Sequence, residues 1–407
     1  MNLENQTVSA RDGRNGTGVR VHDPVKAATG LQPLLASNAA RAEQDRQVPV
    51  ENIRAIEELN LFKIFVPKRW GGYGAPLATA LDVFAELAKG CASTAWVEMI
   101  LSIATWTATL LPDRGQEEIF NSSPHARVAG VFTPSSTARR VDGGYVFTGR
   151  WGFASGSRYA TWATVGIPIP GDNGKTDIGL TFVPMAELEI EDTWYVAGMK
   201  GTGSNTLVAK EVFVPDHRVM RASQIVEGIC PGRTYSDEPS DNYSFVPVAA
   251  LVLCGPSIGM AEAVLAAVAG NAHKRGITYT SYARQADSSV VHRDIAEAAL
   301  KIESARLMAM RAAAEIHDTS IAGRKMAYLN RARVRGECGY ITQTVREAVD
   351  QLMSIAGAGA FAEASPVQRL WRDINVATRH AVDASEICFE LYGRAMLGVK
   401  DNISDLI

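Results

Sequence analysis

Apolar positions change their spacing twice along the 407 residues of the chain, and these changes divide it into three regions. Between residues 25 and 125 apolar side chains recur at helical spacing, and Pro49 stands where a proline favours the first turn of a second helix. Between residues 126 and 218 the spacing falls to two, with Gly and Pro between short runs. From residue 247 to residue 407 the helical spacing returns. We therefore predict an N-terminal helical domain, a central β-domain and a C-terminal helical bundle.

Two segments lie outside these regions. Residues 1–24 are polar and contain several glycines, so we expect a disordered leader. Residues 219–246 are rich in Pro, Ser and Asp and connect the β-domain to the bundle. A long connection of this kind either covers an active site or serves as a plain linker. Within the bundle, residues 290–318 and 328–355 are long enough to form the main helices.

The composition indicates a soluble globular chain of two or three domains. Hydrophobic residues make up 46% and charged residues 21%, with a formal net charge of -3 and no basic stripe or acidic tail. Nucleic acid and membrane surfaces are therefore not expected partners. The polar N-terminal segment predicts no signal peptide or anchor, and hence a cytoplasmic protein. The five cysteines lack CxxC spacing and the histidines lack metal-ligand spacing, so we expect buried free thiols and no metal site.

One stretch, residues 143–163, combines a strand pattern with flat and hydroxylic side chains. Its sequence is GGYVFTGRWGFASGSRYATWA. Two aromatic residues and two serines alternate with Gly and Ala, so on an extended backbone they would share one face. These residues are Trp151, Phe153, Ser155 and Ser157. Such a face suits a flat ligand, whereas a sandwich strand with core aromatics and a glycine bulge would give the same pattern.

Three motifs follow one another in the β-domain. They are G-R-W-G-F-A-S-G at residues 149–156, G-M-K-G-T-G-S at residues 198–204 and V-F-V-P at residues 212–215. This combination resembles the middle domain of the acyl-CoA dehydrogenase superfamily, and more specifically the group D flavin-dependent monooxygenases built on that fold. The resemblance implies an α+β chain with an N-terminal helical domain, a central β-barrel or sandwich domain and a C-terminal four-helix bundle.

Position by position, the resemblance implies flavin-binding roles for residues of these motifs. Phe153 stands where the family places an aromatic on the isoalloxazine ring, Ser155 stands near flavin N5, and Trp151 would flank the ring. The segment F-T-P-S-S lies where the family has a T-E-P-x-x-G-S loop, so Thr133 and Ser135 are candidate contacts. This copy lacks the acidic residue and the Gly-Ser pair, which leaves the individual hydrogen bonds open.

The C-terminal region carries two further matches. Residues 354–360, S-I-A-G-A-G-A, and residues 366–373, P-V-Q-R-L-W-R-D, resemble a family block whose small turn approaches the cofactor. The turn consists of Gly357, Ala358 and Gly359. A looser match concerns the family's R-x-F-G segment, whose arginine reaches the flavin pyrophosphate of a neighbouring subunit. Arg275 and Arg284 compete for that role.

The reaction type depends on the residues that follow this block. Many acyl-CoA dehydrogenases carry a catalytic Glu eight residues after the Asp of the R-D pair, and counting from Asp373 gives Ala381. His380 instead matches the histidine that group D hydroxylases place beside flavin and substrate. Its imidazole could take a proton from a phenol or an indole N–H, or hydrogen-bond the peroxide, although an ordinary core or surface histidine is the structural alternative. Trp96 either walls the substrate site or packs in the core.

The sequence therefore predicts the oxygenase component of a two-component monooxygenase. Reduced FAD, with FMN as the alternative flavin, would come from a separate NAD(P)H-dependent flavin reductase, because the chain has no G-x-G-x-x-G fingerprint. The resemblance implies O2 as co-substrate, a C4a-hydroperoxyflavin as oxidant and an electron-rich indole or phenol as substrate, with an indole oxygenase of terpenoid or alkaloid biosynthesis as the nearest guess. It also implies a homotetramer. The alternatives are an acyl-CoA dehydrogenase with a relocated base, an N- or S-oxygenating relative, and a non-catalytic scaffold.

Overall fold

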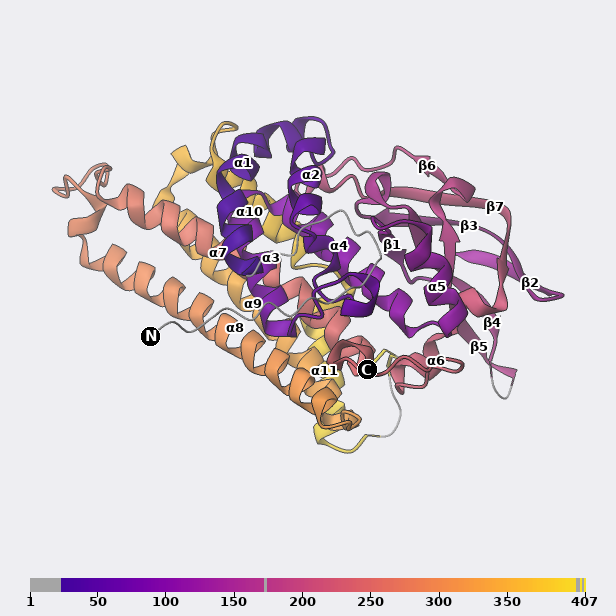
Figure 1. Ribbon diagram of the computed structural model, residues 1–407. Helices are drawn as coiled ribbons and strands as arrows, with labels where there is room; N and C mark the ends of the chain where they lie inside the picture. Colours follow the sequence, from indigo (N-terminus) through magenta and orange to yellow (C-terminus); the bar gives the residue numbers. More distant parts are fainter. Residues whose placement is uncertain (1–22, 172–173, 400–402, 405) are drawn as a thin grey trace, which may run out of the picture.

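The structure is a computed structural model that describes residues 23–171, 174–399, 403–404 and 406–407 (Figure 1). The predicted leader, residues 1–24, lies outside the described residues except for Asp23 and Pro24. These two residues begin the first helix, and the Asp23 carboxylate accepts a hydrogen bond of 3.0 Å from the backbone N–H of Lys26. An acidic cap followed by proline in the first turn is a pattern that favours a helix start.

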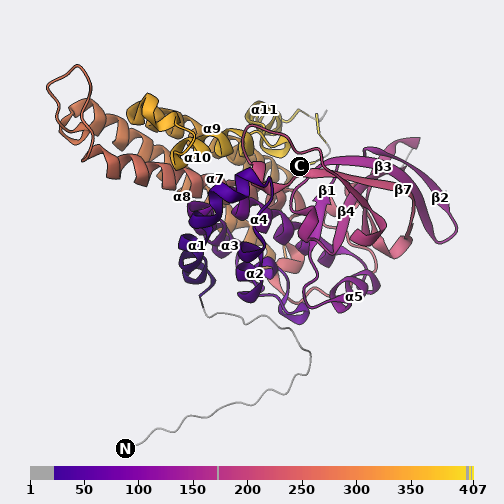
Figure 2. The ribbon, with the colours of Figure 1, turned by 90° about the horizontal axis from the view of Figure 1, so that it is seen from above.

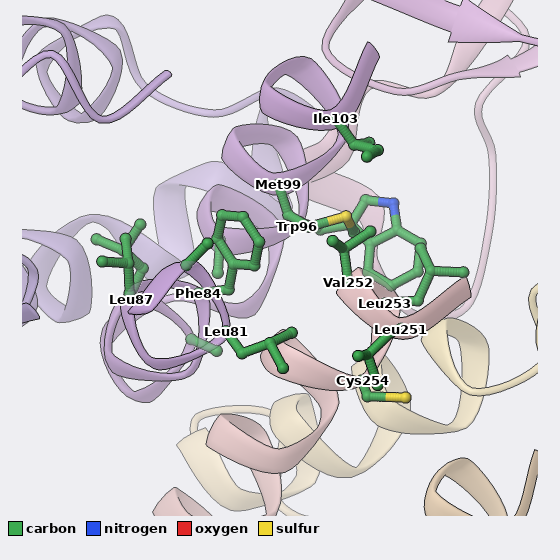
Figure 3. Packing of buried hydrophobic residues seen from close by; sticks show 14 of the residues in the cluster. Leu81, Phe84, Leu87, Trp96, Met99, Ile103, Leu251, Val252, Leu253 and Cys254 are labelled. Atoms are coloured by element: carbon green, nitrogen blue, oxygen red, sulfur yellow. The ribbon is translucent and has the colours of Figure 1, made fainter. Parts of the chain in front are cut away.

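Five α-helices form the described part of the N-terminal domain, in agreement with the helical spacing. They are α1 (Pro24–Gln44), α2 (Val50–Glu58), α3 (Leu77–Gly90), α4 (Ala92–Thr107) and α5 (Asp113–Ser122). The helix α2 begins directly after Pro49, as predicted. In α4 every residue except Ile100 is buried. Figure 3 shows why: Trp96 and Met99 of α4 pack among side chains of α3 and of the long helix α7 (Phe245–Ala272).

The β-domain is a sandwich of two four-stranded sheets, with strand orders β1-β4-β5-β8 and β2-β3-β7-β6. The strands are β1 (Val128–Val131), β2 (Ser136–Val141), β3 (Gly144–Ala154), β4 (Trp162–Pro170), β5 (Thr176–Pro184), β6 (Glu189–Glu191), β7 (Asn205–Pro215) and β8 (Val219–Arg221). Among the described strands, only β1 and β4 pair in parallel. Buried side chains from both sheets, among them Trp151, Val165 and Leu207, fill the space between them. The alternating pattern of residues 126–218 is therefore confirmed as strands.

The connection at residues 219–246 is folded and packs against the helical domain. It contains β8, the short helix α6 (Ala222–Val226) and a 3-10 turn (Pro239–Asn242). The Asp241 carboxylate accepts hydrogen bonds of 2.8 and 2.5 Å from the Arg69 guanidinium. The carbonyl of Ser240 accepts one of 2.8 Å from the indole N–H of Trp106. These bonds hold the turn in place, so the segment is more than a plain linker.

The C-terminal domain consists of long helices, as predicted for residues 290–318 and 328–355. Besides α7 it contains α8 (Ser289–Ile321), α9 (Tyr328–Ala356), α10 (Pro366–Ala377) and α11 (Ser385–Met396). The helix α9 packs against α7, α8 and α11, and α10 packs on α7 and α9. By length and composition α7 could cross a membrane, yet 78% of its most apolar window is buried in the protein, as in a core helix. Figure 2 shows α7 and α8 projecting away from the β-domain.

Candidate active site

A β-bulge in β3 sets the orientation of the first site residue. The pairing of β3 with β7 shifts register between Trp151 and Ala154, and Phe153 inside the bulge has a φ of 65°. The left-handed region costs a residue with a side chain about 1–2 kcal/mol, and bulges are places where a strand redirects a side chain. The Phe153 side chain is accordingly 75% exposed, with its ring 5.5 Å from that of Trp194 in an edge-to-face contact. An exposed aromatic held in this way can support a flat ring.

Trp151 lies on the opposite side of the strand, inside the sandwich. Its side chain is fully buried, and its indole N–H donates a hydrogen bond of 2.9 Å to the carbonyl of Gly166. Its ring packs edge-to-face against Phe147. The predicted common face of Trp151 and Phe153 was therefore wrong, because the bulge interrupts the alternation on which the prediction depended. Trp151 supports the strand from behind and does not flank a ligand on the Phe153 side.

Three buried hydroxyl groups beside the bulge form a hydrogen-bonded chain. Ser155 Oγ lies 2.7 Å from Ser204 Oγ, and Ser204 Oγ lies 2.6 Å from Thr202 Oγ1. Thr202 Oγ1 donates at 2.8 Å to the carbonyl of Met199, which can only accept. Because Thr202 has one proton, Ser204 must donate to Thr202, and Ser155 must in turn donate to Ser204. The Ser155 oxygen can therefore accept a further hydrogen bond but cannot donate one.

Glycines let this part of the β-domain approach both helical domains closely. A Cβ at Gly156 would lie 2.9 Å from the Val97 side chain on α4, and one at Gly198 would lie 2.2 Å from the carbonyl of Arg372 on α10. Such separations exclude a side chain. Ser155 is consequently held next to the α4 segment that carries Trp96.

The helix α10 also fastens the turn at residues 198–204. The Asp373 carboxylate accepts a hydrogen bond of 2.5 Å from the backbone N–H of Met199. Arg372 forms an ion pair of 2.6 Å with Glu43 of α1 and donates a hydrogen bond of 2.5 Å to the carbonyl of Ala197. These bonds join all three domains where the hydroxyl chain lies.

Trp96 and His380 are brought together from α4 and from the segment after α10. Their ring centroids lie 6.0 Å apart, with the ring planes tilted by 56°. Trp96 is 6% exposed, so it packs in the core as well as facing His380. His380 is partly buried, and its Nδ1 accepts a hydrogen bond of 3.3 Å from the backbone N–H of Val382. Burial, reinforced by the positive charge of Arg335, lowers the pKa of His380 to about 4, so the imidazole is neutral at pH 7.

Asp383 is a buried carboxyl group beside the same arginine. Its side chain has no hydrogen-bond partner among the described residues, and burial raises its pKa to about 8. The Arg335 guanidinium donates instead to the carbonyls of Val382 and Leu406, each at 2.7 Å. Asp383 therefore keeps its proton at pH 7. The charge of Arg335 is then not neutralised by Asp383 and opposes protonation of His380.

A second group of predicted residues meets at the far end of the C-terminal domain. Arg275 donates a hydrogen bond of 2.9 Å to the carbonyl of Ala356, and its guanidinium lies 3.1 Å from where a Cβ of Gly359 would be. Gly357 has φ 69° and ψ -178°, a conformation that is essentially restricted to glycine. Arg275, Ala358 and Gly359 are exposed. Figures 1 and 2 place the α7–α8 turn at the end of the domain remote from the β-domain, so this group does not join Phe153 within one chain.

Three predicted cofactor contacts lie apart from these two groups. Arg284 is exposed and forms an ion pair of 2.8 Å with Asp287. Thr133 and Ser135 are exposed in the connection from β1 to β2, and their hydroxyls bond no group within the described part of the chain. Of the two competing arginines, only Arg275 contacts the predicted small-residue turn.

Several site residues that were not predicted stand directly beside those that were. Thr202 and Ser204 belong to the turn that carried the resemblance, and Trp194 precedes that turn. Their hydroxyl and aromatic character was the available signal. Asp383 had no such signal, because one aspartate on a helical segment is ordinarily solvated.

Comparison with known proteins places this geometry in a family. The models of the acyl-CoA dehydrogenase N-terminal and C-terminal domains match residues 27–119 and 251–384. The flavin-dependent monooxygenase oxygenase subunit HsaA of Mycobacterium tuberculosis is 31% identical over 92% of this chain and 95% of its own length. The oxygenase component of the FADH2-dependent resorcinol hydroxylase of Rhizobium sp. is 32% identical over 92% of this chain and 94% of its own. XiaF from Streptomyces sp., in complex with FADH2 and glycerol, has a TM-score of 0.87 and 30% identity over 94% of this chain and 97% of that one.

The chain therefore belongs to the oxygenase components of two-component flavin-dependent monooxygenases with the acyl-CoA dehydrogenase fold. The predicted family, fold class and monooxygenase activity are confirmed, and so is the reduced flavin as cofactor. An oxygenase component implies a separate flavin reductase.

Proposed function

We propose that this chain binds reduced FAD at the Phe153–Ser155 bulge and hydroxylates an electron-rich aromatic small molecule held beside Trp96 and His380. Bound reduced FAD supplies the two electrons that activate O2. In the balanced reaction one oxygen atom enters an aromatic C–H bond, the other leaves as water, and reduced FAD becomes FAD. The protein's part is to hold the ring and the substrate and to exclude water.

The observation that carries this proposal is that the Ser155 hydroxyl can accept a further hydrogen bond but cannot donate one. A reduced flavin bears an N–H at N5, whereas an oxidised flavin presents a bare nitrogen that needs a donor. Because Ser155 donates its proton to Ser204, which donates to Thr202, the Ser155 oxygen can only accept a hydrogen bond from a ligand. The exposed ring of Phe153 beside it offers stacking area for an isoalloxazine. These residues therefore fit the reduced cofactor better than the oxidised one.

The same region argues against acyl-CoA dehydrogenation. Ala381 occupies the position where many dehydrogenases carry their base, and the neighbouring Asp383 is 1% exposed, which prevents contact with a substrate. His380 is neutral and sits against an aromatic wall, as a site for a planar substrate requires.

We also propose that the working enzyme is a homotetramer in which a second copy completes the cofactor site. Support comes from the distance between the Arg275 group and the Phe153 bulge in one chain (Figure 2). Large apolar side chains are also exposed on helices of the C-terminal domain: Leu300 and Leu307 on α8, and Met396 and Leu397 at the end of α11, are 61–82% exposed. Such surfaces are typical of subunit interfaces. Analytical ultracentrifugation measures the assembly, and a sole monomeric species would contradict this proposal.

Anaerobic titration with reduced and with oxidised FAD tests the cofactor assignment. We expect the dissociation constant of reduced FAD to be at least about ten-fold lower than that of oxidised FAD, because one hydrogen bond to N5 contributes about that much affinity. Ser204→Ala removes the acceptor for the Ser155 proton, so Ser155 can donate to oxidised flavin and the preference should shrink. Thr206→Val is the matched control. The Thr206 hydroxyl lies 2.7 Å from that of Thr193, and neither group belongs to the hydrogen-bonded series Ser155–Ser204–Thr202. Equal affinity of the wild-type protein for both redox states would contradict the proposal.

A further inference from the structure

We infer that a second ligand site, for a phosphate group, lies where α4 and α10 begin. The site is a cavity of about 110 Å³ between α1, α4, α10 and the turn at residues 198–204. The residues that line it include none of the proposed cofactor and substrate contacts Phe153, Ser155, Trp96 and His380. Binding there is therefore separate from the proposed function and does not rest on it.

Two helices begin at this cavity. Cys91 and Ala92 at the start of α4 line it, and so does Pro366 at the start of α10. Neither helix has a side chain that caps its first backbone N–H groups. The N-terminus of a helix carries a partial positive charge and unpaired N–H groups, and both favour an anion. Helix ends occur throughout a protein, so the side chains around these two decide whether a site exists.

Two polar side chains at the cavity have no partner among the described residues. Ser93 is 5% exposed, and its hydroxyl forms no hydrogen bond although its oxygen remains open to the cavity. Buried hydroxyl groups are normally hydrogen-bonded. Arg369 is partly buried, and its guanidinium forms no hydrogen bond or ion pair with the described part of the chain. Hydrogen-bond donors from α4 and from α10 therefore remain for a ligand.

The charges around the cavity favour an anion. Three cationic and two carboxylate side chains line it: Lys89, Lys200, Arg369, Glu43 and Asp373. Lys89 and Lys200 form ion pairs of 2.6 and 3.6 Å with glutamates, whereas Arg369 forms none with a described residue. Burial raises the pKa of Asp373 to about 7, so its negative charge is only partly present at neutral pH. The charge of Arg369 is therefore the one that a bound anion would neutralise.

The available donors match a phosphate group. A guanidinium presents parallel N–H groups that can bond two oxygens of one phosphate. The Ser93 hydroxyl and the first N–H groups of α4 come from a different helix, and a tetrahedral anion has further oxygens for them, whereas a planar carboxylate has only two. A water molecule needs roughly 10–15 Å³ of such space, so a cavity of about 110 Å³ has room for inorganic phosphate. A phosphate bound there would join α4 to α10.

Isothermal titration calorimetry with inorganic phosphate tests the site, in chloride buffer of constant ionic strength at pH 7. We expect one phosphate to bind per chain. Arg369→Gln should weaken binding at least about ten-fold, because a charge-assisted hydrogen bond contributes about that much affinity. Ser93→Ala removes a neutral hydrogen bond and should weaken binding about three-fold or more. Arg54→Gln is the matched control, because it removes the same charge at an exposed position on α2.

Two further titrations identify the ligand. Acetate should bind more weakly than phosphate, and the phosphate affinity should be the same with and without saturating reduced FAD under anaerobic conditions. Competition between phosphate and FAD would overturn the inference, because these groups would then hold the phosphates of the flavin. Absent binding by the wild-type protein, an unchanged affinity in Arg369→Gln or Ser93→Ala, or an equal loss in Arg54→Gln would also overturn it. Circular dichroism shows whether each variant has folded.

Discussion

Replacing Asp383 with asparagine should make the protein more stable, and the gain should depend on pH. The pKa of this carboxyl is raised from 3.8 to about 8 by burial. The folded state therefore holds a proton that the unfolded state releases above pH 3.8. Stability from this group is fully present below that pH and is lost as pH rises toward 8. The difference of about four pKa units corresponds to roughly 5 kcal/mol, at about 1.36 kcal/mol for each unit.

Asparagine has a similar shape and cannot ionise, so Asp383→Asn removes this loss. We expect variant and wild type to differ little near pH 4 and the variant to be more stable by about 4 kcal/mol near pH 7, as an order of magnitude. Urea unfolding between pH 4 and pH 8, followed by circular dichroism, measures the difference. Glu386→Gln, at an exposed neighbouring position, should show no such pH dependence. Lower stability of Asp383→Asn at both pH values would refute the reasoning, because it would mean an ionised Asp383 paired with Arg335.

Four further substitutions test the geometry of the site. Phe153→Gly should raise the stability by about 1 kcal/mol in thermal unfolding, because glycine adopts a φ of 65° without strain. The same substitution should weaken FAD binding. A loss of stability would contradict the strain assigned to Phe153. Gly198→Ala should lower the free energy of unfolding in urea by about 1–3 kcal/mol, because the added Cβ would lie 2.2 Å from the Arg372 carbonyl. An unchanged free energy of unfolding would argue against that contact. Arg275→Gln should weaken the binding of reduced FAD in a titration and Arg284→Gln should not, because only Arg275 contacts the turn at Gly357–Gly359. The reverse order would contradict the choice of Arg275.

The domains could be predicted because periodicity records which side of an element is buried. The change from helical to alternating spacing near residue 126 marks the start of the sandwich, and the long runs after residue 247 became α7 to α9. The bulge at Phe153 could not be predicted, because a left-handed conformation is usually indicated by glycine and here is adopted by phenylalanine. The alternation rule therefore assigned Trp151 to the wrong face.

The sequence indicates candidate site residues where one motif contains them, and it does not indicate contacts that distant segments supply. Ser155 and His380 stand in motifs that carry a family resemblance. The direction of the hydroxyl chain depends on Thr202 reaching a carbonyl, and the protonation of Asp383 depends on Arg335 being bound elsewhere. Both are properties of three-dimensional contacts, which a single sequence does not specify.

Anaerobic stopped-flow mixing tests the central claim most directly. Protein with reduced FAD is mixed with oxygenated buffer, and O2 consumption is followed together with the absorbance of oxidised FAD. Our account predicts that oxidised FAD appears later than O2 is lost, because the site would hold the flavin and exclude water from it, and that an aromatic substrate that is hydroxylated shortens this delay. Oxidised FAD that appears together with O2 loss, at the rate of free reduced FAD, would contradict it.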